Sequence, residues 1–206
     1  MTITSWLSIA SICLLGAMSP GPSLAVVLRQ TLSGGRKSGF IAAIAHGLGF
    51  GLYALMSVSG IAVIITTSAV LFLGLQWLGA AFLIWLGIKG LSAKAPPPAT
   101  EHDIPPAPPS SGSAVRDGFL IVFFNPKIAV FLIALFSQVI GSATTGIERL
   151  VYASTAMFID MGWYLVVAWL FSNRRWLGIL QKNVVWLERI FGVILVAVGI
   201  RLLVGL

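Results

Sequence analysis

Apolar runs of about 20 residues, each long enough to cross the hydrocarbon core of a bilayer, alternate along this chain with short polar segments. They predict six transmembrane helices, over residues 6–28, 40–64, 68–90, 117–140, 147–171 and 187–205. Composition agrees, because 58% of the 206 residues are hydrophobic and only 9% are charged, against about a quarter charged in soluble domains. The sequence therefore predicts an all-α, multi-pass integral membrane protein.

Basic residues gather between the apolar runs, and mainly on one side of the membrane. The rich segments hold Arg29, Arg36, Lys37, Lys89, Lys94, Arg116, Arg174, Arg175 and Lys182. By the positive-inside rule these segments are cytoplasmic, which places both termini outside the cytoplasmic membrane. Because the net charge of +7 lies beside the membrane and forms no stripe on a soluble face, nucleic acid is not expected as a partner.

Residues 93–113 hold seven of the ten prolines and almost nothing apolar. This segment predicts a disordered cytoplasmic linker between two halves, 1–92 and 114–206, and a proline-rich ligand for a partner domain is the alternative reading. The N-terminus lacks the basic region of a signal peptide and predicts a retained helix. Residues 173–190 mix tryptophans with basic residues and predict an amphipathic helix at the headgroups.

Two apolar runs are interrupted in the same way. SPGPSLAVVL, residues 19–28, and FNPKIAVFL, residues 124–132, share Pro, Ala, Val and Leu in register when Pro22 is aligned with Pro126. The offset carries the first span onto the fourth. Each half then has an odd number of spans, so the halves have opposite orientations, as in the inverted repeats of many secondary transporters. The fold predicted is two inverted three-helix repeats with broken helices one and four.

A proline removes an amide donor and clashes with the preceding turn, but it is well placed as the first residue of a helix. Each run can therefore stop and restart inside the membrane, leaving free amides and a positive dipole end that favour an anion. The candidate substrate-binding residues at the breaks are Ser19, Pro20, Gly21, Pro22, Ser23, Asn125, Pro126 and Lys127. A simple kink filled by neighbouring helices is the alternative.

Asp160 lies in the middle of the fifth run. An acid there is unfavourable by several kcal/mol and is a functional candidate, either for a substrate ammonium group or for a coupling proton. A structural ion pair with Lys127 is the alternative. His46 begins a polar stripe with Phe50, Tyr53 and Ser57 and is a second candidate for proton coupling, or else a packed histidine.

Other features narrow the class of protein. The single cysteine, Cys13, excludes an internal disulfide and a cysteine-clustered metal site. The chain has no motif of a hydrolase, a metalloprotease or a nucleotide-binding enzyme, so neither an enzyme nor a cofactor is expected. Gly35, Gly39, Gly47 and Gly51 form small-xxx-small pairs, which favour close helix packing and are compatible with a homodimer.

Four stretches together resemble one family: SPGPSLAVVL, GGRKSGFIAAIAHGLGFGLYAL, WLGAAFLIWLGIKGL and FFNPKIAVFL. They are similar to the lysine exporter (LysE/RhtB) family of bacterial amino-acid exporters, over nearly the whole chain apart from the long linker. The resemblance implies a six-span inner-membrane carrier, driven by the proton gradient. Its motifs fall on Pro20, Gly21, Pro22, Gly35, Arg36, Gly39, Asn125, Pro126 and Lys127.

The sequence thus predicts a secondary transporter that moves a small zwitterion outward. The two helix breaks would receive the carboxylate with the help of Lys127, and Asp160 would receive the ammonium group or the proton. An exporter of metal or other small ions is disfavoured, since such paths use several carboxylates or histidines. A non-transporting scaffold would leave the breaks and Asp160 without a purpose.

Overall fold

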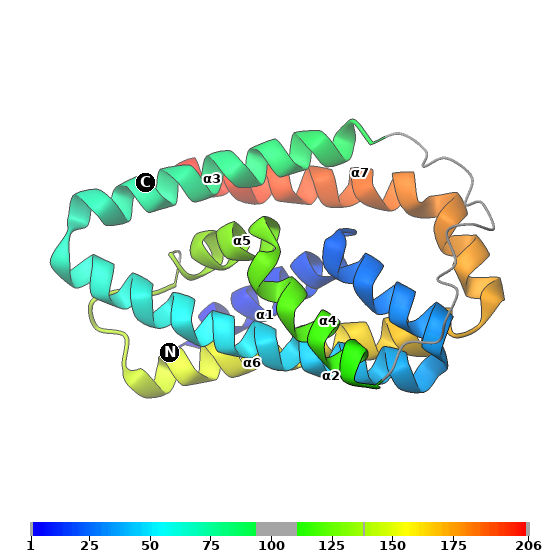
Figure 1. The fold of residues 1–206 in the computed structure, drawn as a ribbon. Coiled ribbons are helices and arrows are strands. Elements are labelled where there is room, and N and C mark those ends of the chain that lie inside the picture. Colours follow the sequence, from blue (N-terminus) through cyan, green and yellow to red (C-terminus); the bar gives the residue numbers. More distant parts are fainter. Residues whose placement is uncertain (1, 94–110, 138, 205–206) are drawn as a thin grey trace.

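The computed structural model describes residues 2–93, 111–137 and 139–204, and the regular structure in these residues is entirely helical (Figure 1). The all-α prediction is confirmed. The helices are α1 (Ile3–Met18), α2 (Pro22–Thr67), α3 (Ala69–Leu91), α4 (Ser111–Phe124), α5 (Pro126–Phe136), α6 (Gly146–Phe171) and α7 (Arg174–Val204).

Fewer helices than predicted can cross a membrane by length and composition. Four described segments qualify, namely Pro22–Ile64, Val70–Leu91, Gly146–Phe171 and Lys182–Arg201, and the bent pair α4–α5 would make a fifth. The run predicted over 6–28 is divided between α1, which ends at Met18, and α2, which begins at Pro22, so the chain breaks where the prolines predicted it, and α1 alone has only 16 residues.

The loop predicted between the first and second runs, residues 29–39, is wrong. Residues 29–39 are helical apart from Gly35, whose φ of 72° and ψ of −177° interrupt α2. Only glycine adopts such a conformation without strain. Figure 1 shows α2 turning back between its blue and cyan parts. A single glycine therefore takes the place of the predicted loop.

Two further boundaries differ from the prediction. Ser111, Gly112 and Ser113, expected in the linker, form the first turn of α4, while residues 94–110 lie outside the described part. The amphipathic segment 173–190 is helical from Arg174 as predicted, but it continues directly into the last span as one helix. Its position at the headgroups stays a prediction.

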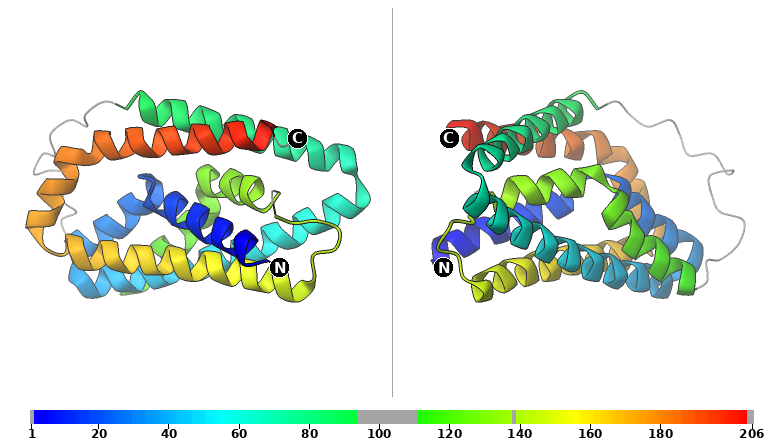
Figure 2. Two further views of the ribbon diagram at one scale, coloured as in Figure 1. Left: turned by 180° about the vertical axis from the view of Figure 1, so that it is seen from behind. Right: turned by 60° about the vertical axis from the view of Figure 1, so that its left-hand side comes forward.

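The helices form three layers (Figure 2). Helices α3 and α7 lie side by side in an outer layer, and α2, α4 and α6 pack together on the opposite side. The short helices α1 and α5 lie between these layers, so both helix breaks are inside the molecule.

Glycines bring the helices close together, as their spacing predicted. A Cβ built on Gly47 would lie 2.5 Å from Met161 Cβ, and one on Gly51 would lie 2.6 Å from the Met157 sulfur, so both glycines face α6. In the outer layer, a Cβ on Gly87 would lie 2.6 Å from the carbonyl oxygen of Gly192. Small residues of this kind let helix backbones approach where the membrane provides no hydrophobic driving force.

Candidate functional site

The two helix breaks meet, and Lys127 joins them. Its ammonium group donates to the Ser19 hydroxyl at 2.6 Å, to the Ser19 carbonyl at 3.1 Å and to the Pro20 carbonyl at 3.2 Å. These oxygens follow the C-terminal end of α1, where unpaired carbonyls and the negative end of the helix dipole favour a cation. Lys127 at the start of α5 therefore stabilises the end of a helix from the other half of the chain.

Asn125 holds the second break in place. Its side-chain oxygen accepts from the Lys127 amide at 3.1 Å and caps α5, while its Nδ2 donates to the Ser23 hydroxyl at 3.1 Å. The axis bends by 58° between α4 and α5 at this residue. Asn125, Ser19 and Ser23 are all buried. Asn125 thus takes one of the amides that the sequence analysis left free for an anion.

The start of α2 differs, because Gly21 provides no side-chain cap and Pro22 has no amide hydrogen. The Ala25 amide makes the first helical bond, to the Gly21 carbonyl at 3.1 Å. The amides of Ser23 and Leu24 precede that bond and have no partner in the hydrogen-bonded part of the helix. They remain the candidate anion donors.

Asp160 pairs with His46. Asp160 Oδ2 lies 2.7 Å from His46 Nδ1, with the histidine fully buried and the aspartate 3% exposed. His46 Nε2 is buried without a hydrogen-bond partner among the described residues. The alternative reading of Asp160 as the counter-ion of Lys127 is therefore wrong, because each of the two groups binds other atoms.

An inner cavity connects these groups. Its lining includes Ser19, Gly21, Ser23, His46, Phe50, Asn125, Lys127, Asp160 and Tyr164, and it is a small cavity of about 30 Å³. The His46 ring packs against Tyr164, with ring centroids 4.6 Å apart, and against Phe50. The structure thus brings together predicted residues from both breaks, His46 of the second run and Asp160 of the fifth run.

Some predicted residues lie elsewhere. Tyr53, from the polar stripe of His46, stacks on Phe123 with centroids 5.4 Å apart. Gln76, a polar residue of the third run that was not predicted to belong to the site, donates to the Ser137 carbonyl at 3.1 Å and connects α3 to the end of α5. Tyr164 was missed, although it lies one helical turn from Asp160, a spacing that places it on the same face.

A wider vestibule lies on the other side of Lys127. It encloses about 1350 Å³, open solvent included, and the two breaks form one wall through Pro20, Pro22 and Pro126. Trp85, Lys89 and Glu188 of the outer layer are among the residues of the opposite wall. Ser19, Gly21, Asn125 and Lys127 line both spaces and therefore separate the vestibule from the inner cavity.

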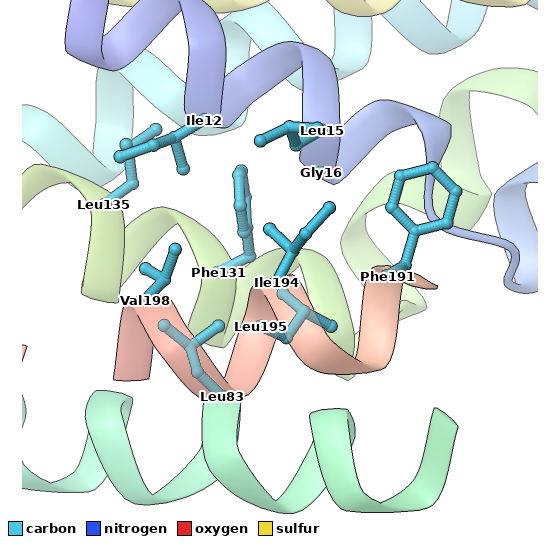
Figure 3. Close-up of a pocket in the computed structure, with 10 residues that line it drawn as sticks. All are labelled: Ile12, Leu15, Gly16, Leu83, Phe131, Leu135, Phe191, Ile194, Leu195 and Val198. Carbon is cyan, nitrogen blue, oxygen red and sulfur yellow. The ribbon is translucent and has the colours of Figure 1, made fainter. Parts of the chain in front are cut away.

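A third space is apolar throughout. Figure 3 shows Phe131 and Leu135 of α5 facing Ile12 and Leu15 of α1 and the side chains of α7 across it. It shares Leu195 with the vestibule, and it shares Gly16 and Phe131 with the inner cavity. Apolar surface thus adjoins both polar spaces.

This arrangement can hold a small charged molecule. It offers a cation at paired helix breaks, two open amides and a buried acid–imidazole pair that can exchange a proton. Within the described residues, no group of three or more His, Cys, Asp or Glu side chains is placed to hold a metal ion. These are the features of a membrane carrier with broken helices at its core.

Comparison with known proteins gives the family. The profile of the LysE type translocators matches residues 14–206, and the chain belongs to that family. A membrane protein of Vibrio cholerae is 30% identical over 80% of this chain and 86% of its own length. A leucine efflux protein of Enterobacter is 34% identical over 68% of this chain and 67% of its own. One from Klebsiella pneumoniae is 29% identical over 75% and 74%. No solved structure matches.

The comparisons confirm the resemblance to the lysine exporters that the sequence motifs indicated. Together with the apolar helices they make the chain a multi-pass membrane protein. The family is one of translocators, which agrees with the expectation that the chain is not an enzyme.

Proposed function

We propose that this protein is a secondary transporter that exports amino acids from the bacterial cytoplasm in exchange for protons. The single observation that carries the proposal is the position of Lys127 at two meeting helix breaks, next to a cavity that contains His46 and Asp160. Membership of the LysE type translocators and the leucine efflux relatives support an amino acid with an apolar side chain as the substrate.

In this proposal the carboxylate of the substrate binds at Lys127. A carboxylate is a stronger partner for an ammonium group than the Ser19 and Pro20 carbonyls are, because both groups are ionised. The amides of Ser23 and Leu24 and the dipole of α2 add to the attraction. Binding would draw Lys127 away from the end of α1 and loosen the partition between the two polar spaces.

His46 and Asp160 carry the coupling proton in this proposal. A buried carboxylate beside an imidazole can hold a proton on either group, and His46 Nε2 is left for a further partner in the cavity. An acid and a histidine inside a membrane protein are typical of proton relays. Among the described residues that line this cavity, His46 and Asp160 are therefore our candidates for carrying the coupling proton.

The inverted repeat is part of the proposal. Under the alignment of Pro22 with Pro126, α1 corresponds to α4, and the rest of α2 corresponds to α6. The α1–α6 and α4–α2 contacts would then be equivalent, and α3 would pair with its counterpart α7. Such exchanged halves can rock against each other around a shared site, which is how many carriers alternate access.

The test is amino-acid counterflow in proteoliposomes that contain the purified full-length protein. Vesicles loaded with unlabelled leucine should accumulate labelled leucine, and an imposed pH gradient should drive net movement. Folded protein that shows no counterflow with leucine or with a panel of other amino acids would overturn the proposal. Flux of a divalent cation in the same vesicles would favour the ion exporter instead.

A further inference from the structure

Glu188 is a charged residue that neither the helix breaks nor the proton pair accounts for. It lies in the apolar span Lys182–Arg201, six residues from its start, or about 9 Å along the helix axis. An acid at such a depth requires a partner or a function. Its side chain is half-buried, and the part of the chain that the structure describes offers it no ion pair or hydrogen bond.

The surroundings of Glu188 in the vestibule indicate what it binds. Glu188 lines the vestibule wall opposite the breaks, and its carboxylate attracts the Lys127 ammonium group electrostatically. Lys127 is nevertheless held by the oxygens of Ser19 and Pro20, not by Glu188. The Glu188 carboxylate and the Lys127 ammonium group thus line the same open space without forming an ion pair. This charge pattern is complementary to a zwitterion.

The rest of the vestibule is suited to an apolar side chain. Trp85 and Phe82 pack with ring centroids 5.5 Å apart, and both line the space. Lys89 lies 5.4 Å from the Trp85 ring, so a cation–π contact holds this second base. Leu195 connects the vestibule with the apolar cavity of Figure 3.

We propose that the vestibule is an entry site for an amino acid with an apolar side chain, in which Glu188 binds the substrate ammonium group while Lys127 binds its carboxylate. The inference rests on the proposed function and adds a residue and a binding step to it. The substrate meets Glu188 first and reaches the inner cavity only after Lys127 has left Ser19. Asp160 then carries only the coupling proton and is not needed to bind the substrate ammonium group.

The test compares two ligands that differ only in the ammonium group. Leucine and its deamino analogue isocaproate both have the carboxylate for Lys127, but only leucine can use Glu188. We expect Glu188→Gln to weaken leucine binding to the purified protein about tenfold, as for loss of a charge-assisted hydrogen bond, and to leave isocaproate binding unchanged. The control is Arg189→Gln, at an exposed neighbouring position outside the vestibule lining, which should change neither.

Equal weakening of both ligands in Glu188→Gln, or no change in either, would overturn the entry site. If wild-type protein shows leucine counterflow at the same time, the proposed function stands alone. If wild-type protein shows counterflow neither with leucine nor with any other amino acid of the panel, the proposed function fails and the entry site fails with it.

A second measurement leaves Glu188 intact and does not depend on how its variant folds. Ser92 is exposed and lines the vestibule, and the one native cysteine, Cys13, is 3% exposed. Leucine should slow the reaction of Ser92→Cys with a thiol reagent several-fold. It should not slow the reaction of Thr2→Cys, which is exposed outside the vestibule lining. Equal rates with and without saturating leucine at Ser92→Cys would contradict occupancy of the vestibule.

Discussion

Lys127 and Asp160, the two charged side chains that line the inner cavity, are each bound by specific partners. Lys127 is bound by three oxygens at the end of α1, and Asp160 is bound by His46 Nδ1. In a membrane, an unpaired charge would cost several kcal/mol, so both arrangements stabilise the fold. Both arrangements can also change during transport. A substrate carboxylate can replace the neutral oxygens that bind Lys127, and Asp160 and His46 can exchange a proton because both are ionisable.

The pairing of Asp160 can be measured with double-mutant cycles on thermal unfolding. We expect a coupling of about 1–3 kcal/mol between Asp160→Asn and His46→Gln, because the two groups share a buried hydrogen bond. The matched cycle of Asp160→Asn with Lys127→Met should give less than about 0.5 kcal/mol, because Lys127 binds Ser19 and Pro20. A larger coupling in the second cycle would restore the Lys127–Asp160 ion pair.

The same variant tests proton coupling. Asp160→Asn should keep leucine counterflow, which needs no net proton movement, and should lose most of the leucine accumulation driven by a pH gradient. The two assays are run on the same vesicles, so counterflow controls for folding and insertion. Gradient-driven accumulation at the wild-type level would remove Asp160 from the coupling mechanism.

At this scale the sequence identified the residues but not their partners. Lys127, Asp160 and His46 are conspicuous because polar groups are rare in apolar runs. Their partners depend on how each helix is rotated and how deep it sits, which apolar residues on all sides of a membrane helix do not determine. Glu188 was missed because it lies within an amphipathic segment, where an acid needs no explanation.

At the scale of elements, the prolines predicted the two breaks and the chain was less regular than expected elsewhere. Pro22 and Pro126 each begin a helix, as their missing amides favour. The turn at Gly35 was not predicted, because basic residues around it are equally typical of a cytoplasmic loop. Only a positive φ distinguishes a one-residue hinge from a loop, and the sequence does not encode that value directly.

Close helix contacts give a prediction at this scale. A Cβ on Gly118 of α4 would clash with the Ala42 carbonyl oxygen of α2, a backbone atom that can move only if the helix moves with it. Gly118→Ala should therefore lower stability by about 1–3 kcal/mol. Gly162→Ala in α6 meets no atom within 4 Å and should be neutral or stabilising, by up to about 1 kcal/mol. Thermal unfolding in detergent measures both, and equal stabilities would contradict the packing of α2 on α4.

At the scale of the whole molecule, the arrangement of the ends constrains the topology. Figure 1 shows the N- and C-terminal ends at the same end of the molecule, and the end of α3 and the start of α4 at the opposite end. The positive-inside rule then assigns a side to each end, because Lys89 lies in the last turn of α3, whose end is opposite the termini. The vestibule, which reaches Ser92 and Ala93, would open toward the cytoplasm.

Labelling single cysteines in intact spheroplasts tests this orientation. Thr2 and Val204 are exposed near the two ends of the chain, and Ser92 is exposed at the end of α3. An impermeant thiol reagent should label Thr2→Cys and Val204→Cys directly, and Ser92→Cys only after the membrane is permeabilised. The parent chain with buried Cys13 is the control and should stay unlabelled. Because an odd number of crossings would separate the termini, labelling of only one terminal cysteine would contradict the arrangement itself. Labelling of Ser92→Cys alone would reverse the orientation and make the vestibule an exit from the carrier instead of its entrance.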